Sequence, residues 1–402
     1  MGGVKAAWME EEARGWTPPA TNVCDCCVED EYLKQLIRNE MSEAACDYCG
    51  RRSDVPIAAP VEVLMGPIAF AVYRYFAEPG EAGVPYDEGE YVVDSIGTSD
   101  VLTALDLECH ESLFEDLEAA FHNQYWVPAA HGQWLSSHPH EELLDQWHRF
   151  VEIVKYRSRF FFERATVESH LVSISVNPAT VLQSVAECAA GLGLIQPLAD
   201  GTPLYRARMR RSGDLWEPSA KEMGAPPRGI ARAGRMNPAG IPYLYVARER
   251  STAIAEVAGA PPCALVVAEF KTLRDLTLLD LGELPELPSV FDESRAQEYS
   301  SLIFLREFAD EVSHPVAKDG REHLEYAPTQ VVCEFFAQAQ DIEGERRIEG
   351  IIYGSAVFPE GRNIVLFPDH DDEDHPFAGI VYVDAETVDF QTWTDLSSGM
   401  ST

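Results

Sequence analysis

The sequence predicts an α+β protein in which a zinc-bearing helical domain precedes a mixed α+β domain. Two pairs of cysteines near the N-terminus have the spacing of a structural metal site. Apolar side chains then recur at helical spacing as far as residue 193. From Leu204 onward, short apolar and β-branched runs bounded by turn residues predict strands.

The length and charge of the chain argue against some classes of function, such as DNA binding. The chain has 402 residues, enough for two or three domains, and 46% of them are hydrophobic, which suffices for buried cores. Its 31 basic and 67 acidic residues give a formal charge of -36, which would repel the phosphates of DNA. No apolar run is long enough to span a membrane, and no apolar core follows Lys5 as in a signal peptide. We therefore expect a cytoplasmic protein that binds neither DNA nor membranes.

Five of the nine cysteines lie near the N-terminus. Cys24, Cys27, Cys46 and Cys49 form the pattern C-x2-C-x18-C-x2-C, which supplies the four thiolates of a tetrahedral zinc site. In a cytoplasmic protein, clustered cysteines favour a metal over disulfides, although free buried thiols are the alternative. Four thiolates leave no open position, so we expect structural zinc. Cys26 is an additional thiol, and the spacing leaves open which of the first three cysteines bind the metal.

The first half of the chain is predicted to be helical. We expect a flexible leader over residues 1–22 and a zinc-bearing helical domain over residues 23–195. Asn177 and Pro178 have the order of an N-cap and a first helical residue, and Gly191 would end that helix. Other helices are expected at Asp30–Ile37, Pro60–Tyr75 (where a strand is the alternative), Glu111–His122 and His138–Arg159, and Ser99–Asp100 could cap a further short helix.

Residues 196–402 are predicted to form the mixed α+β domain. The expected strands are Leu204–Met209, Tyr243–Ala247, Ala264–Phe270, Leu276–Leu281, Gly350–Tyr353, Asn363–Phe367 and Gly379–Val383. The expected helices are Thr252–Ala258, Ala296–Glu311 and Thr329–Gln338.

Arginine is concentrated between Leu204 and Glu256 despite the acidic charge of the whole chain. A basic segment in an acidic protein suits one small anionic ligand, which planar guanidinium groups hold through paired hydrogen bonds. The arginines in this segment are Arg206, Arg208, Arg210, Arg211, Arg228, Arg232, Arg235, Arg248 and Arg250.

The same segment carries short motifs that resemble the RES domain. No single motif is specific to this family, but the occurrence of all of them in this order over about 150 residues is specific. The N-terminal half is similar to the cysteine-bearing HEPN/RES N-terminal segment that precedes some RES domains. The motifs are Tyr205-Arg206, Gly234-Arg235-Met236-Asn237-Pro238, Pro242-Tyr243-Leu244-Tyr245, Ala255-Glu256-Val257, Tyr326-Ala327-Pro328-Thr329-Gln330 and Gly350-Ile351-Ile352-Tyr353-Gly354-Ser355.

The resemblance implies an ADP-ribosyltransferase-like fold and an enzyme that consumes NAD+. Family members hydrolyse NAD+, transfer its ADP-ribosyl group to phosphate or modify a protein. We expect an NAD+ glycohydrolase that acts as a toxin or effector of a toxin–antitoxin or defence system. The implied partners are NAD+ and an antitoxin or trigger protein, and self-association stays open.

Candidate site residues follow from what this chemistry requires. Cleavage of the nicotinamide–ribose bond develops positive charge on the ribose, as glycoside hydrolysis does, and Glu256 is the candidate carboxylate to stabilise it. Arg206 and Arg235 are candidates for binding the diphosphate. Tyr245 would contact the nicotinamide, and Ser355 would orient a ribose hydroxyl or the glutamate. Related transferases carry their glutamate on a strand, whereas Glu256 is predicted on a helix.

Other interpretations compete with this site. Glu256 could be an exposed helix residue paired with Arg248 or Arg250. The chain could instead be a protein ADP-ribosyltransferase, or a non-catalytic binding or sensor protein organised by zinc. Arg164 and His170 have about the separation of the pair in HEPN-type ribonucleases, but the acidic chain favours a chance pair.

Overall fold

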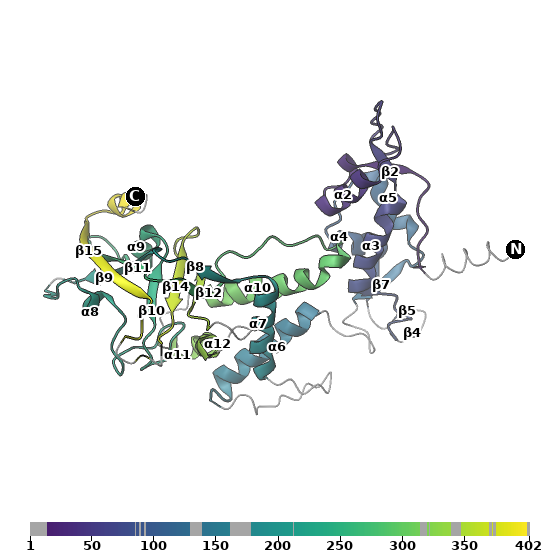
Figure 1. Ribbon diagram of the computed structural model, residues 1–402. Helices are drawn as coiled ribbons and strands as arrows, with labels where there is room; N and C mark the ends of the chain where they lie inside the picture. The colour runs from purple at the N-terminus through teal and green to yellow at the C-terminus, as the bar shows by residue number, and fades with distance from the viewer. Residues whose placement is uncertain are drawn as a thin grey trace. The chain divides into compact units, whose positions relative to one another are not determined.

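The computed structural model describes residues 14–84, 86–87, 90–91, 94–128, 139–160, 178–211, 213–313, 320, 322–338, 347–369, 372 and 375–399. The chain forms two compact units (Figure 1). The first contains Met1–Glu142 and Leu287–Ser300, and the second contains Leu143–Glu286 and Ser301–Thr402. The predicted domain ranges 1–22, 23–195 and 196–402 stay predictions for independently folding parts.

The first unit is mainly helical, as predicted. Its helices are η1 (Asp25–Cys27), α2 (Glu31–Asn39), α3 (Glu62–Tyr75), α4 (Thr98–Ala104), α5 (Glu111–Ala120) and η4 (Glu293–Arg295). Its short strands are β1 (Asn22–Cys24), β2 (Ala58–Pro60), β3 (Phe76–Ala77), β4 (Tyr86–Asp87), β5 (Glu90–Tyr91), β6 (Ile96–Gly97) and β7 (Tyr125–Pro128).

Local sequence explains where these helices begin. The Asp30 carboxylate accepts a hydrogen bond from Leu33 N at 2.9 Å and so caps α2, whose Leu33 and Ile37 are buried. The helix expected at Ser99 and Asp100 begins slightly earlier, at Thr98, because Asp100 accepts a hydrogen bond from the backbone of Gly97. The apolar run that ends at Tyr75 is the helix α3, so the strand alternative is wrong.

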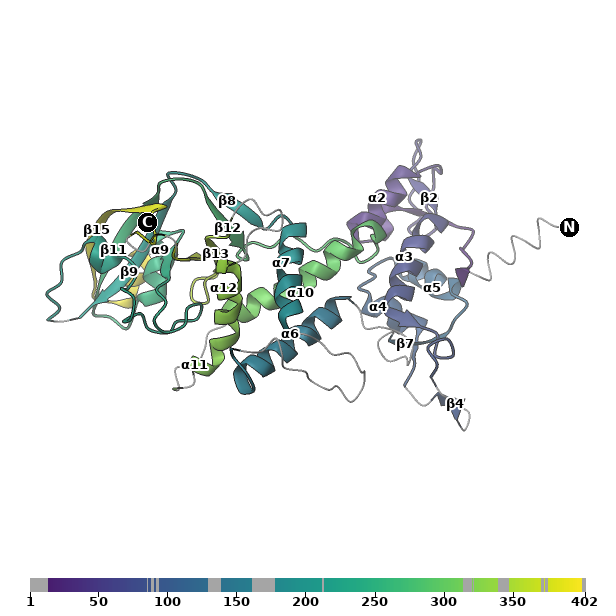
Figure 2. The ribbon, with the colours of Figure 1, turned by 60° about the horizontal axis from the view of Figure 1, so that its bottom comes forward.

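The second unit is built on a mixed eight-stranded sheet with the order β15-β11-β9-β10-β14-β13-β12-β8. Figure 2 labels β15, β11 and β9 toward one end of this order and β13, β12 and β8 toward the other. Neighbouring strands are antiparallel except β12 and β13, which are parallel. The strands are β8 (Ile195–Leu198), β9 (Pro203–Arg210), β10 (Leu244–Ala247), β11 (Cys263–Thr272), β12 (Leu276–Asp280), β13 (Gly350–Gly354), β14 (Arg362–Leu366) and β15 (Ile380–Phe390).

Helices accompany this sheet. They are α6 (Pro139–Tyr156), α7 (Pro178–Gly191), α8 (Ala220–Met223), α9 (Arg250–Val257), α10 (Ala296–Ser313), α11 (Glu322–Glu325), α12 (Ala327–Gln338) and α13 (Trp393–Gly399). Helices α6 and α10 contribute most of their residues to this unit. The predicted strands and helices are present with small shifts in their ends, which confirms the α+β class.

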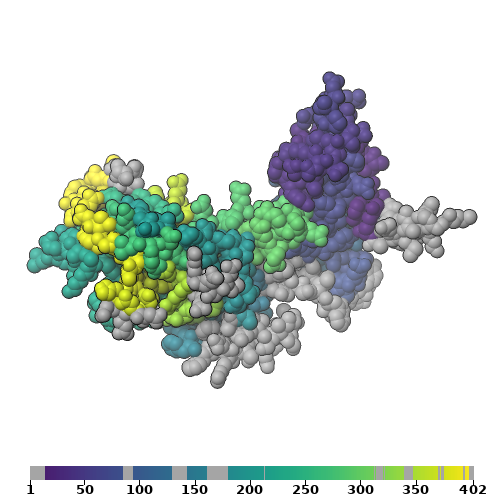
Figure 3. Space-filling model, in the orientation of Figure 1, coloured from purple at the N-terminus to yellow at the C-terminus, as the bar shows by residue number. Residues whose placement is uncertain are grey.

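Two features of the sheet were not predicted. Strand β8 was missed because Gln196 and Pro197 interrupt its apolar pattern. Strand β15 continues to Phe390, beyond the predicted end at Val383, and it forms one edge of the sheet. Its Val381 and Val383 are exposed. Yellow atoms from this C-terminal part of the chain lie at the surface in Figure 3. Its later residues are mostly polar, which hid the strand from a search for apolar runs.

The two faces of the sheet bury different clusters. In β14, Val365 belongs to the cluster that α6, α7, α10 and α12 contribute to, whereas Ile364 and Leu366 belong to a second cluster. This is the alternation expected of a strand that is buried on both faces. Helix α9 packs near β9 through a third cluster that contains Ala207, Ala247 and Ile254.

Strands β9 and β10 are paired at a single position among the described residues. Strand β9 pairs with β11 from Pro203 to Arg210, and β10 pairs with β14 over its whole length. Between β9 and β10, the described residues pair only at Tyr205 and Ala247. The two strands therefore separate directly after Tyr205, at Arg206.

Among the described residues, no helix is both long and apolar enough to cross a membrane.

Candidate functional site

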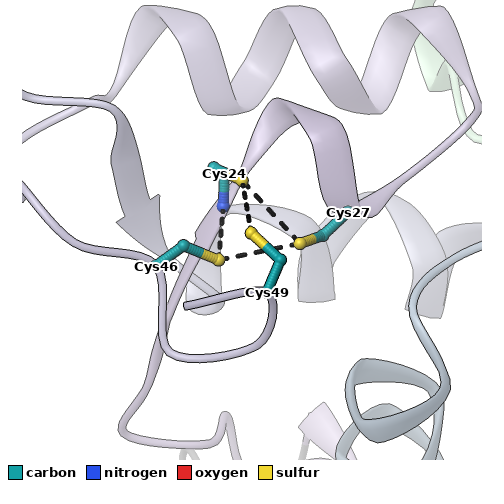
Figure 4. Close-up of side chains that lie close together, drawn as sticks. All are labelled: Cys24, Cys27, Cys46 and Cys49. Atoms are coloured by element: carbon teal, nitrogen blue, oxygen red, sulfur yellow. Dashed lines mark hydrogen bonds between the residues drawn. The ribbon is translucent and has the colours of Figure 1, made fainter. Parts of the chain in front are cut away.

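The predicted metal ligands lie together in the first unit. The Sγ atoms of Cys24 and Cys27 are 3.7 Å apart, those of Cys24 and Cys49 are 3.5 Å apart, and those of Cys27 and Cys46 are 3.6 Å apart (Figure 4). A tetrahedral zinc ion bound at about 2.3 Å would hold its sulfur atoms about 3.8 Å apart. The four cysteines could therefore hold a metal ion with little rearrangement.

Backbone N–H groups also favour thiolates here. Burial acts to raise the pKa of Cys46, but hydrogen bonds from the N–H groups of Cys49, Tyr48 and Cys24 lower it to about 7. Burial raises the pKa of Cys24 to about 12, so a metal cation would be needed to keep all four sulfur atoms deprotonated.

Cys26 lies outside this set of four. Its thiol is exposed, and its Sγ accepts a hydrogen bond from Arg51 Nη1 at 2.7 Å. Cys26 also comes near Cys24 together with Asp25, but only the other grouping brings four thiols together. The geometry thus favours Cys24 and Cys27 as the ligands from the first cysteine cluster.

In the second unit, Glu256 is held by two side chains from other segments. Its Oε1 accepts hydrogen bonds from Ser355 Oγ at 2.8 Å and from Asn363 Nδ2 at 2.5 Å. Ser355 and Asn363 are buried, whereas Glu256 is exposed. Arg250, which the sequence offered as a partner for Glu256, instead pairs with Glu386. The carboxylate is thus oriented by neutral donors while one side faces solvent.

Helix α9 is fixed against the turn that follows Ser355. Glu249 Oε2 accepts hydrogen bonds from Thr252 Oγ1 at 2.9 Å and from Arg362 N at 3.0 Å. Gly361 is required here, since a Cβ would collide with Thr252 Oγ1 and lie 2.7 Å from its Cγ2. The Ser355 oxygen accepts the backbone N–H groups two and three residues later, at 3.3 and 3.1 Å, so its own proton is directed to the glutamate.

Arg206 directly follows Tyr205, the residue of β9 that pairs with β10. Its Nη1 donates to Gly224 O at 2.7 Å, and burial followed by repulsion from Arg208 lowers its pKa to about 10, against an opposing effect of Tyr245. No carboxylate of the described residues pairs with its guanidinium. A partly buried cation without a counter-charge favours binding of an anion.

The side chain of Arg206 and the carboxylate of Glu256 belong to different parts of the sheet. Arg206 pairs with Ala268, which is in the second buried cluster, whereas α9 packs with Ala207 of the opposite face. The backbone pairing of β9 with β10 ends at Tyr205, directly before Arg206. The five predicted site residues therefore do not form one contact cluster.

Tyr245 uses its hydroxyl inside the protein. The hydroxyl donates to Asn237 Oδ1 at 2.8 Å and accepts from Met236 N at 3.1 Å, and burial raises its pKa. These bonds fix the loop that carries Arg235. The predicted contact of Tyr245 with nicotinamide would have to use its ring.

Arg235 and Glu256 share Tyr353 as a neighbour. Burial mainly raises the pKa of Tyr353, the negative charge of Glu256 raises it further, and the positive charge of Arg235 lowers it. Tyr353 pairs with Asn363 across β13 and β14, so both lie on the same face as the glutamate. Met236, the neighbour of Arg235, packs in the same core cluster as Tyr353, while Glu256 is bonded to Ser355 and Asn363.

Sequence reasoning missed Asn363 and gave no role to Thr329 or Gln330. Asn363 is a buried amide at the start of an otherwise apolar strand, and that isolated polar position was the available signal. Arg164 and His170 lie outside the described residues, so the ribonuclease alternative stays a hypothesis.

Comparison with protein families agrees with the order of motifs. Residues 39–168 match the HEPN/RES N-terminal domain 1, and residues 203–390 match the RES domain. A comparison with curated proteins finds no match. The RES match contains the five candidate residues, whereas Cys24 and Cys27 precede the N-terminal match. The chain therefore belongs to the RES-domain proteins that carry a HEPN/RES N-terminal domain.

Proposed function

We propose that the RES domain is an NAD+ glycohydrolase of a toxin or effector protein. The RES match supports an NAD-related, toxin-like function at the family level. The observation that carries the specific reaction is Glu256, whose exposed carboxylate is oriented by buried Ser355 and Asn363. Cleavage of the nicotinamide–ribose bond needs such a preorganised negative charge beside the ribose.

In the proposed reaction, Glu256 stabilises positive charge that develops on the ribose as the bond to nicotinamide breaks. Its Oε1 is occupied by Ser355 and Asn363, whereas Oε2 has no hydrogen-bond partner among the described residues and can accept from a ribose hydroxyl or from water. Water then adds to the anomeric carbon, the bond electrons leave with neutral nicotinamide, and one proton is released with ADP-ribose.

In this proposal, Arg206 and Arg235 bind the diphosphate of NAD+. Arg206 supplies a partly buried cation at the margin of β10, and Arg235 supplies a second cation near Tyr353. A diphosphate between them would provide the counter-charge that Arg206 lacks within the described residues.

Protein ADP-ribosylation is the second candidate because Glu256 is exposed and an acceptor larger than water could approach it. Phosphate is a third acceptor. The test is to incubate the full-length protein with NAD+ labelled in its adenylate part and to follow nicotinamide, ADP-ribose and labelled protein. Free ADP-ribose in amounts equal to nicotinamide supports hydrolysis, and label on protein or ADP-ribose phosphate supports transfer. Intact NAD+ would favour the non-catalytic alternative.

We also propose that the four-cysteine set binds structural zinc. The sulfur spacing and the N–H donors to Cys46 support a closed tetrahedral site. The proposed reaction of the RES domain does not use this site.

A further inference from the structure

Two side chains at the start of α12 hold the loop that carries Arg235. Gln330 Nε2 donates to Gly234 O at 2.7 Å and to Asn237 O at 3.0 Å. Thr329 Oγ1 lies 2.6 Å from Arg235 O, closer than the carbonyl of its own helical turn at 3.0 Å. These residues belong to a motif for which the proposed reaction has no role.

A third contact completes the arrangement. Met236 N donates to the Tyr245 hydroxyl at 3.1 Å, and that hydroxyl donates to the buried Asn237 amide oxygen at 2.8 Å. The two peptide groups on either side of Arg235 are therefore both fixed by side chains. Because the backbone of Arg235 cannot rotate freely, the region that its guanidinium can reach is limited.

The loop is also closely packed. A Cβ at Gly234 would lie 2.6 Å from Asn237 Oδ1 and 2.9 Å from the Tyr245 hydroxyl, so any larger residue would displace the contacts that fix the loop. Gly234 N donates to Asn237 O at 2.9 Å, which closes the loop on itself. Thr329 is itself buried, so water does not readily replace its hydroxyl.

We infer that Thr329 and Gln330 are positioning residues that fix Arg235 for binding the anionic part of the substrate. The inference rests on the proposed function for the identity of the substrate, NAD+, but the fixation of the loop itself does not. Met236, next to Arg235, packs in the same core cluster as Tyr353, and Asn363, which pairs with Tyr353 across the sheet, donates to Glu256. A displaced loop would therefore move Arg235 relative to the strands that hold the Glu256 carboxylate.

The experiment compares side chains of similar size in the full-length protein. Thr329→Val and Gln330→Met remove the donors, Thr329→Ser keeps the hydroxyl, and Val331→Ala removes only packing from the same helix. We expect the first two to raise KM for NAD+ roughly tenfold with kcat little changed, as loss of uniform binding does, and the serine variant to behave as wild type. In an Arg235→Ala background, Gln330→Met should add almost nothing, because both changes remove the same contact.

Hydrogen–deuterium exchange of the peptide covering residues 233–241 tests the loop without NAD+. Exchange should be slow in wild type and at least about tenfold faster in Gln330→Met, with β11 and β14 unchanged. Fast exchange in wild type, or equal KM effects from Gln330→Met and Val331→Ala, would overturn the inference. If Arg235→Ala leaves NAD+ turnover unchanged while exchange behaves as expected, the proposed role in NAD+ binding fails but the fixation of the loop stands.

Discussion

Individual residues divide the proposed site into groups that bind and a group that acts on the reacting bond. Arg206 and Arg235 carry charges suited to a diphosphate, whereas Glu256 is oriented by Ser355 and Asn363. Interactions that exist only in the transition state affect turnover, and those present throughout affect binding. Kinetics of single variants can therefore separate the two groups.

Replacing Glu256 with glutamine should lower kcat roughly a hundredfold or more while NAD+ still binds, because the charge is lost but the size is kept. Steady-state kinetics and calorimetry on folded protein measure both. Glu286→Gln serves as the control, because it removes the same charge from an exposed glutamate that has no hydrogen bond to the proposed site residues. Near-normal turnover in Glu256→Gln would remove this residue from the proposed chemistry. In cells, the same variant should relieve any growth arrest caused by NAD+ loss.

Replacing Arg206 or Arg235 with alanine should weaken NAD+ binding about tenfold or more, since each loses a charge-assisted contact to diphosphate. Calorimetry with a catalytically impaired Glu256→Gln background avoids turnover during the titration. Arg211→Ala is the control because its side chain is exposed and Asp214 is bonded only to its backbone N and O atoms. Unchanged affinity in both test variants would place the diphosphate elsewhere.

At the scale of elements, α9 and the turn after β13 depend on each other. Glu249 joins Thr252 of the helix to Arg362 of β14, and Gly361 leaves room for the Thr252 side chain. The turn therefore sets the position of Ser355 relative to Glu256. Neither element alone would orient the carboxylate.

Gly361→Ala should destabilise the second unit by about 1–3 kcal/mol, because the added methyl overlaps the Thr252 side chain. Chemical denaturation measures this loss, and kcat should fall as Ser355 shifts. Adding Thr252→Ala makes room and should recover part of the stability despite the lost bond to Glu249. A single Gly361→Ala variant as stable and active as wild type would show that the turn adapts freely.

At the scale of the molecule, the two units have different sources of stability. The first unit contains the four-cysteine set beside a core that includes Leu33, Ile37 and Trp126. The second unit is organised by its eight-stranded sheet and needs no metal in the proposal. Loss of metal should therefore destabilise the first unit and leave the stability of the second unit unchanged.

The purified protein should contain about one zinc per chain, measured by elemental analysis of protein prepared without chelator. Cys46→Ser or Cys49→Ser, or a strong chelator, should speed hydrogen exchange in residues 14–84 and leave the strands of the second unit unchanged, since metal binding and folding are linked. Cys26→Ser is the matched control, because Cys26 lies outside the set of four. Full zinc content in Cys46→Ser would contradict the assignment of ligands.

The sequence by itself determined most of the main helices and strands, the family, and the set of four cysteines that could hold a metal ion. Periodicity of apolar residues decides helix or strand locally, so α2, α3, α10 and the main strands were predictable. The cysteine spacing predicted which four cysteines lie together, because each close pair restricts the positions of its own two thiols.

Only the tertiary structure decided which polar side chains meet. Asn363 reaches Glu256 across 107 positions, and Gln330 reaches Gly234 across 96. Such contacts depend on the order of strands in the sheet, which no local pattern encodes. The same order placed Arg206 at the margin of β10 and paired Arg250 with Glu386 instead of Glu256. Local sequence therefore specified the parts of the site, and the sheet topology specified their partners.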